Sequence, residues 1–352
     1  MAIKLVVSID SIANLAGVSR GTVSRSFNKR SDISPKTREK VLEIARKNHY
    51  FPNSSARGLA RGRTETVGIV VPEIINPFLP EMITAIEKAA GKHEMSALLA
   101  ITEGDISIQE KLLNKMASGQ VDGILITPCE SVESINMLNH INHKIPLVCL
   151  KNFAGLRCSS VSYDDGLGVR LLIEHLYELG HRRIAYIYPA GSRWTVKQRI
   201  DAYNVMLDLF SIEYRKLYEI NDDPPFEDIW KQITKMIFDS CDHNMPTAIL
   251  AFDDIIGMHL MKAAETAGYS VPRDISIAGF DNIAFSMLSS VPLTTVCVNR
   301  GRLGETAIDI LIRQLRSEIK HEEIHHVTLT PELLVRKSTA APPSPEKNIV
   351  KH

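Results

Sequence analysis

Residues 8–28 read SIDSIANLAGVSRGTVSRSFN, and this stretch decides what the chain is expected to be. Apolar residues of 9–16 recur at i, i+3, i+4 and i+7 behind Ser8, which predicts a short amphipathic helix with a serine N-cap. Gly17 tolerates the positive φ of a tight turn, and Ser19 can cap a second helix over 20–27. The stretch therefore predicts a helix, a turn and a second helix.

A third helix is expected directly afterwards. Ser34 supplies an N-cap and Pro35 the first helical position, and an apolar stripe follows over 41–45. Three such helices bury one small core between them. Residues 1–51 are accordingly predicted to form a small all-α headpiece.

The charge distribution points to the partner of this headpiece. The 352 residues carry 41 Lys and Arg against 41 Asp and Glu, so the whole chain is neutral. Residues 1–63, however, hold 13 basic and 4 acidic side chains, and the rest of the chain has the opposite excess. A basic head on an acidic body is typical of a module that binds a polyanion.

The second helix is the element that would read DNA. In a helix-turn-helix it lies in the major groove, where arginine can donate two hydrogen bonds to guanine. Arg20 and Arg25 are the predicted base-reading residues, and the alternative is a basic helical face that only stays solvated. The remaining candidate DNA contacts on or beside this helix are Ser19, Thr22, Ser24 and Asn28.

Residues 52–65 form the expected linker. Their glycines, serines and arginines describe a basic tether too short to hold a helix alone, which can become ordered on DNA.

The remainder alternates short apolar runs with helical patterns. This βαβ order over 66–337 exceeds one sheet and predicts two doubly wound lobes of parallel strands, so that the chain combines an all-α helix-turn-helix headpiece with an α/β body. The expected strands are 67–71, 96–100, 123–126, 146–150, 184–187, 248–252 and 275–279, and the expected helices are 78–90, 106–117, 166–179, 199–210, 255–267 and 305–315.

Acidic residues follow several of these strands. Asp164, Asp253 and Asp281 stand at predicted carboxyl ends, where sheets of this kind bind ligands. Their carboxylates are expected to accept hydrogen bonds from ligand hydroxyls or to pair with Arg199. The alternative is that they cap helices or remain solvated in loops.

The ordered series of motifs resembles the LacI/GalR family of bacterial transcription regulators. It comprises residues 8–28, the run SPKTREKV at 34–41 and YFPN at 50–53, and the similarity extends over nearly the whole chain. The resemblance implies a body like that of periplasmic binding proteins, with three crossovers near Tyr163, Val296 and Val327.

The same resemblance assigns further residues. In the linker it implies a hinge helix that enters the minor groove, with Leu59 as an apolar wedge and Asn53 and Arg57 matching the family pattern. In the body it places Asn76 and Phe78 of an Asn-Pro-Phe loop, Arg199 and Asp281 in the effector pocket. Arg193 is a further candidate there.

Two signatures concern the compartment and the assembly. Five single cysteines without a C-x-x-C pair favour a reduced, cytoplasmic setting, and no run approaches the roughly 20 apolar residues that span a membrane. Residues 338–352 are proline-rich and predicted to be disordered, and they lack the leucine heptads of a coiled coil, which favours a homodimer over a tetramer.

Two rival functions remain at this point. His321, Glu322 and His325 spell the H-E-x-x-H pattern of zinc hydrolases, although the surrounding stretch is polar and no third ligand is evident. A solute-binding protein would share the two lobes but would carry an export signal in place of the basic head. The sequence favours a cytoplasmic repressor that is not an enzyme, binds a near-palindromic operator, and responds to a small sugar-like effector without metal or cofactor.

Overall fold

A computed structural model of the chain divides into two compact units, Met1–Glu65 and Thr66–His352. Each unit is described by itself. The residues that the structure describes are 7–27, 33–51, 62–191, 193–221, 225–239, 244–320 and 323–343.

The headpiece holds helices α1 (Ile9–Ala16), α2 (Arg20–Phe27) and α3 (Pro35–Lys47). Ser8 caps α1 reciprocally: its Oγ accepts from the Ser11 amide at 3.2 Å, and the Ser11 Oγ accepts from the Ser8 amide. Gly17 has a φ of 67°, as the tight turn requires. The helices enclose one core, formed by Ile12, Ala13, Ala16, Val23, Val41 and Ala45.

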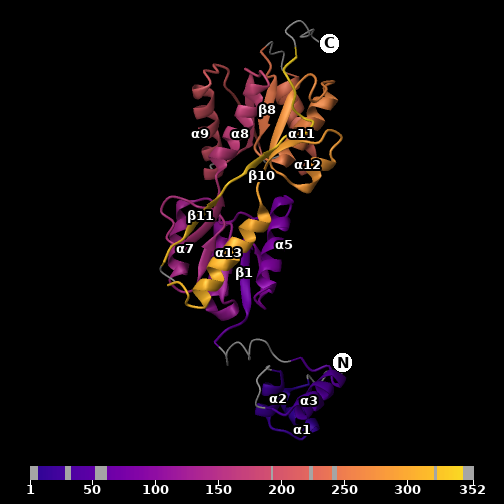
Figure 1. Ribbon diagram of the computed structural model, residues 1–352, viewed down its shortest axis with the longest axis vertical. Coiled ribbons are helices and arrows are strands. Elements are labelled where there is room, and N and C mark those ends of the chain that lie inside the picture. Colours follow the sequence, from indigo (N-terminus) through magenta and orange to yellow (C-terminus); the bar gives the residue numbers. More distant parts are fainter. Residues whose placement is uncertain are drawn as a thin grey trace. The chain divides into compact units, whose positions relative to one another are not determined.

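The body contains two six-stranded sheets, one in each lobe (Figure 1). The first lobe has the strand order β11-β5-β4-β3-β1-β2, and all of its strand pairs are parallel. Its elements are β1 (Thr66–Val71), α5 (Phe78–Gly91), β2 (Ser96–Ile101), α6 (Ile106–Lys115), β3 (Gly123–Ile126), α7 (Val132–Asn142), β4 (Leu147–Cys149), β5 (Ser159–Tyr163), α13 (Arg300–Leu315) and β11 (His326–Leu329).

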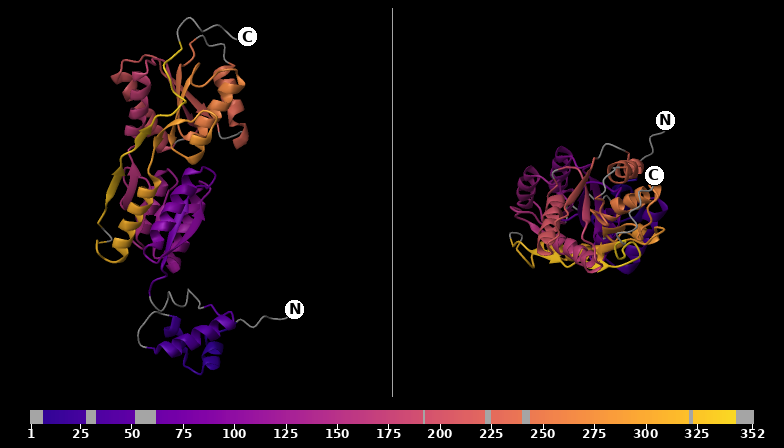
Figure 2. Two further views of the ribbon diagram at one scale, coloured as in Figure 1. Left: turned by 45° about the vertical axis from the view of Figure 1, so that its right-hand side comes forward. Right: turned by 90° about the horizontal axis from the view of Figure 1, so that it is seen from above.

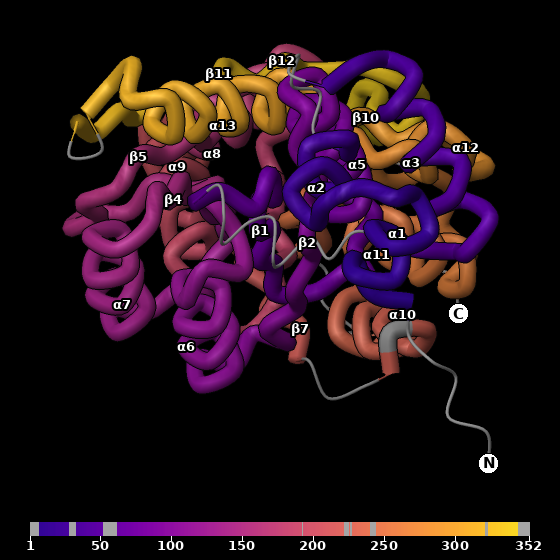
Figure 3. The backbone as a smooth tube through the Cα atoms, turned by 90° about the horizontal axis from the view of Figure 1, so that it is seen from below, coloured from indigo at the N-terminus to yellow at the C-terminus, as the bar shows by residue number. Residues whose placement is uncertain are grey.

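Helices cover both faces of the first sheet, with α5 and α13 on one face and α6 and α7 on the other (Figure 3). The alternation of side chains along β1 explains this. Val67, Ile69 and Val71 pack toward α5 and α13, whereas Val70 packs toward α6 and α7. A strand buried on both faces reads as a continuous apolar run.

The second lobe repeats the arrangement in the order β12-β10-β9-β8-β6-β7. Only β12 is antiparallel to its neighbour among the described pairs of this sheet. Its elements are α8 (Asp165–Glu178), β6 (Ile184–Pro189), α9 (Trp194–Leu209), β7 (Lys216–Ile220), α10 (Ile229–Ile233), β8 (Ala248–Ala251), α11 (Asp254–Thr266), β9 (Ser276–Asp281), α12 (Ala284–Leu288), β10 (Thr294–Cys297) and β12 (Glu332–Leu334).

The chain passes between the lobes three times (Figures 1 and 2). The passages follow β5, follow β10 and separate β11 from β12. They lie where crossovers were expected near Tyr163, Val296 and Val327, and the expected fold class is confirmed. None of the helices in the described ranges has the length and apolar character needed to cross a membrane.

Two helices begin earlier than their apolar pattern indicates. Helix α9 begins at Trp194 rather than at 199, and α13 begins at Arg300 rather than at 305. Thr195 and Arg300, in the two additional turns, form hydrogen bonds to the other lobe, and such contacts give no periodic apolar signal.

The expected disorder from residue 338 onward is wrong for the part that the structure describes. Ser338 is fully buried; its Oγ donates to the Ile277 carbonyl at 2.6 Å and accepts from the Thr294 amide at 2.8 Å. The Ala340 carbonyl accepts from the His181 side chain. Composition predicted disorder because hydrogen bonds to distant strands leave no trace in local sequence.

His181 makes the stability of the second lobe pH-dependent. Burial lowers the pKa of His181 to about 4, so the folded chain holds a neutral ring between Thr247 and Ser276. The unfolded chain takes up a proton near pH 6.5, so acidification favours unfolding. We expect the free energy of unfolding to fall by about 2 kcal/mol between pH 7 and pH 5 from this group. Urea titrations should show a shallower pH dependence for His181→Gln; an equal slope would contradict the assignment.

Candidate nucleic-acid interface and ligand site

Helix α2 presents its basic side chains to solvent. Arg20 and Arg25 are exposed, Thr22 and Ser24 are half-buried, and Val23 anchors the helix in the core. The Ser19 Oγ accepts from the Thr22 amide at 3.1 Å, so these two hydroxyl residues close the first turn of α2. The positions predicted to read bases therefore lie on the outward face of a fixed helix.

Arg20 forms an ion pair with Asp10 of α1, with Nε 3.0 Å from Oδ1. Both side chains are exposed, and such pairs contribute little to stability. The pair can exchange for a DNA contact at small cost. The other predicted DNA contacts, Asn28, Asn53, Arg57 and Leu59, lie outside the described residues.

In the body, two consecutive aspartates follow both β5 and β8, and the members of each pair have different tasks. Asp164 and Asp253 are helix N-caps, accepting from the Leu167 and Ile256 amides at 2.8 Å. The second aspartate of each pair, Asp165 or Asp254, points into the protein instead. A helix start thus separates neighbouring carboxylates into a cap and an inward acceptor.

Arg199 is the cation at the centre of this region. It is 4% exposed, its Nη2 lies 2.7 Å from Asp165 Oδ1, and its guanidinium stacks 3.6 Å from the centre of the Phe280 ring. Burial disfavours its charge, but Asp165 and Asp281 overcome this and raise the pKa of Arg199. Arg199 stays charged and holds Asp165 ionised. Arg199 was expected to pair with Asp164, Asp253 or Asp281. Its ion-pair partner is Asp165 instead, which was not among the residues predicted from the sequence.

Asp253 and Asp281 complete a cluster between the lobes. Asn76 of the first lobe donates to Asp253 of the second across 3.3 Å. Burial raises the pKa of Asp281 to about 7, with Arg199 acting against the shift. Within the described residues, the Asp281 carboxylate receives no hydrogen bond. With a pKa near neutrality, the Asp281 carboxyl group can accept a hydrogen bond from a ligand hydroxyl or, when protonated, donate one.

The other predicted ligand residues divide between the cluster and the surface. The Phe78 ring packs edge-on to Tyr163 at 6.0 Å, beside the cluster. Arg193 is exposed at the N-cap position of α9. Asp164 lines a cavity of about 420 Å³ with Asp165, Lys151 and Gln198. This volume falls in the range of small-molecule sites.

A second junction of the lobes was missed by sequence reasoning. Thr195 of α9 forms hydrogen bonds with two side chains of the first lobe. Its amide and Oγ1 donate to Glu130 at 2.9 and 2.7 Å, and Lys151 donates to its Oγ1 at 2.6 Å. These residues follow β3 and β4, as ligand-site residues do. Their place after strands was the one indication available.

The zinc-hydrolase pattern has no structural counterpart in the part of the chain that the structure describes. His321 and Glu322 lie outside it, and His325 precedes β11 in non-helical backbone. No cluster of three or more potential ligands occurs among the described residues. A zinc helix of this type needs both histidines on one helical face, which residue 325 does not offer.

These features define a class: a helix-turn-helix headpiece attached to a two-lobed body with a cluster of buried charged side chains between the lobes. Comparison with known proteins agrees. Residues 8–53 match the model of bacterial regulatory proteins of the lacI family, and 173–339 match a periplasmic binding protein-like domain. The HTH-type transcriptional regulator DegA of Bacillus subtilis (strain 168) is 33% identical over 95% of this chain and 98% of its own length. The chain belongs to the lacI family of bacterial transcription regulators.

Solved structures give the same result. The Lac repressor dimer bound to operator and an anti-inducer aligns with a TM-score of 0.83 and 25% identity, covering 95% of this chain and 99% of that one. A LacI family regulator from Enterococcus faecium with bound ribose aligns with a TM-score of 0.67 and 28% identity, covering 78% and 99%.

Proposed function

We propose that this family member is a homodimeric, cytoplasmic repressor without enzymatic activity, which binds a near-palindromic operator through α2. A neutral, sugar-like effector that occupies the cluster between the lobes lowers or raises its affinity for the operator. Arg20 and Arg25 read bases, with Ser19, Thr22, Ser24 and Asn28 beside them. Asn53, Arg57 and Leu59 serve the hinge. Asn76, Phe78, Asp164, Arg199, Asp253 and Asp281 line the effector site, and Arg193 lies at its margin.

One observation carries the effector assignment. Arg199 is already neutralised by Asp165, and Asp253 and Asp281 add two further buried carboxyl groups to the same cluster. Hydroxyl groups can form hydrogen bonds with such carboxyl groups in either protonation state, whereas an anion would find the charge of Arg199 already paired with Asp165. The ribose of the Enterococcus faecium regulator and the cellobiose of the regulator CelR are ligands of this chemistry.

A thermal-shift screen tests this assignment. Ligands that bind only the folded state raise Tm by mass action. We expect one or more neutral sugars to raise Tm, and the corresponding sugar phosphates to raise it far less. Stabilisation by sugar phosphates alone would contradict the acceptor role of Asp253 and Asp281.

Arg25→Ala and Lys36→Ala separate base reading from phosphate binding. Both residues are exposed on the headpiece, Arg25 on α2 and Lys36 on α3. We expect Arg25→Ala to relax preference at one operator position at a cost of about 1–3 kcal/mol, and Lys36→Ala to weaken all sequences alike.

The measurement is Kd for an operator selected from random duplexes and for a scrambled duplex, at two salt concentrations. Equal losses on both duplexes for Arg25→Ala would remove it from the reading positions. A chain that binds neither duplex would refute the repressor function.

A further inference from the structure

The turn that carries Asp281 has an unusual backbone. Asp281 has a φ of 103° and Asn282 a φ of 53°. Residues other than glycine rarely adopt such values, and they persist where surrounding structure over-determines them, most often at functional sites. What holds this turn therefore positions Asp281 in the ligand site.

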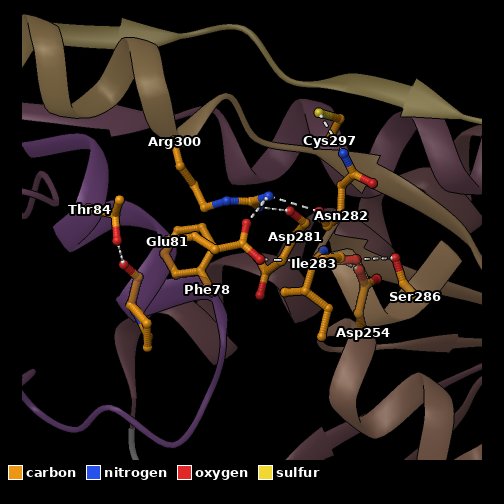
Figure 4. A network of polar contacts seen from close by, with 12 residues as sticks. Phe78, Glu81, Thr84, Asp254, Asp281, Asn282, Ile283, Ser286, Cys297 and Arg300 are labelled. Carbon is orange, nitrogen blue, oxygen red and sulfur yellow. Dashed lines mark hydrogen bonds and ion pairs between the residues drawn. The ribbon is translucent and has the colours of Figure 1, made fainter. Parts of the chain in front are cut away.

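Part of the restraint comes from within the second lobe. The Asp254 carboxylate accepts from the Ile283 amide at 2.9 Å and from the Thr295 hydroxyl at 2.5 Å, and Arg336 donates to the Asn282 side chain at 2.5 Å. Figure 4 shows Asp254 reaching the chain just beyond the turn. These contacts fasten the side chains and the following amide, but they leave the turn's own carbonyls unoccupied.

The two carbonyls are taken by Arg300, the first residue of α13 in the first lobe. Its Nη1 donates to the Asp281 carbonyl, and its Nη2 donates to the Asn282 carbonyl at 2.9 Å (Figure 4). The side chain is 13% exposed. A planar guanidinium can address two carbonyls and an anion together, which an ammonium cannot.

The third partner of Arg300 lies on α5. Glu81 Oε2 is 2.7 Å from the Arg300 Nη2, and Glu81 Oε1 accepts from the Ala284 amide at 3.4 Å (Figure 4). Glu81 thus contacts both Arg300 and the segment after the turn. It belongs to the first turn of α5, which begins at Phe78 and follows the loop that carries Asn76.

We propose that Arg300 and Glu81 are positioning residues that join the Asp281–Asn282 turn of the second lobe to the start of α5 in the first, so that the ligand site and α5 move together. The inference deepens the proposed function, on which its link to operator binding rests. The pair fixes the backbone of the turn and connects it to α5, the helix that follows β1. Strand β1 begins at Thr66, directly after the linker in sequence.

Hydrogen exchange on the full-length chain without DNA or ligand tests the junction. Two segments are followed, residues 78–91 and residues 281–288. In Arg300→Met we expect amides at the start of both segments to exchange at least tenfold faster. Glu81→Gln, a milder change, should accelerate both in the same pattern, and the double variant should exchange no faster than Arg300→Met because the pair acts as one unit.

Matched controls lie on the same helices. Arg302→Met removes an exposed arginine two residues along α13, and Glu87→Gln alters an exposed glutamate of α5; neither should change exchange in the two segments. Arg300→Lys retains a cation for Glu81 but lacks the planar guanidinium that donates to both carbonyls. The amides of 78–91 should therefore stay protected from exchange, while those of 281–283 exchange faster. Two outcomes would overturn the proposal. In one, Arg300→Met and Glu81→Gln both accelerate amide exchange only in residues 281–288; in the other, they accelerate it in neither segment.

A second experiment adds the selected operator duplex as the probe. Coupling between sites is reciprocal, so DNA bound at the headpiece should alter exchange in 281–288, and Arg300→Met should reduce that change at least fivefold. An operator-bound chain with unchanged exchange there would refute the link to DNA binding. A chain that binds no DNA would refute the proposed function instead, and the DNA-free experiment would still decide the junction.

Discussion

Arg199→Met is expected to lower the free energy of unfolding of the body by about 3–5 kcal/mol, because it removes one partner of a buried ion pair. Asp165 would lose both of its contacts with the guanidinium, and Asp253 and Asp281 would lose the cation that most lowers their pKa. Urea unfolding measures the loss. The ligand-induced rise in Tm should disappear in the same variant.

Two comparison variants make the result specific. Asp165→Asn combined with Arg199→Met removes both charges, so it should lose less stability than Arg199→Met alone. Lys197→Met breaks an exposed pair with Asp201 on the same helix and should cost no more than about 1 kcal/mol. If Arg199→Met and Lys197→Met had the same free energy of unfolding, Arg199 would not be the buried cation on which the cluster depends.

Gly168→Ala is the second change with a large expected effect. A Cβ at Gly168 of α8 would lie 2.5 and 2.6 Å from two atoms of the Phe280 ring, the ring on which Arg199 stacks. Phe280 is buried, so relief requires repacking, and overpacking of this kind costs about 1–3 kcal/mol. We expect lower stability together with weaker ligand binding.

Gly166→Ala is the matched control for this helix. A Cβ there meets its nearest atom, Asp164 Oδ1, at 3.4 Å. A glycine to alanine change without steric conflict stabilises by about 0.4–1 kcal/mol through the unfolded state. The two substitutions should therefore shift the urea midpoint in opposite directions, and a shift in the same direction would contradict the packing described for Phe280.

Local chemistry was sufficient for the headpiece and for most of the sheet. Caps at Ser8 and Ser34, the turn at Gly17 and the apolar spacing behind them are contacts between residues a few positions apart, so the sequence displays them directly. Buried parallel strands such as β1 and β8 are equally legible as short apolar runs. Edge strand β7 alternates exposed and buried residues, and it was not predicted.

The buried cluster between the lobes was predicted in outline, but the pairing of its charges was not. Position after a strand identified the regions of Asp164 and Asp253, but it could not tell which of two adjacent aspartates caps the helix and which turns inward. That choice depends on where Arg199 lies, 34 residues away from Asp165 in sequence. Arg300 was overlooked for a related reason, since its partners are two carbonyls and a glutamate from other elements.

The amino-acid sequence was enough to give the class of each unit and the chemistry available between the lobes, because periodicity, capping and composition act over neighbouring residues. The passages between the lobes followed from the family resemblance. The folded chain was needed to show that Asp165 neutralises Arg199, that Arg300 and Glu81 bridge the lobes, and that Ser338 and Ala340 bond to elements of the second lobe. Such pairings depend on burial and on distances between segments far apart in the chain, and these exist only once the sheets have formed.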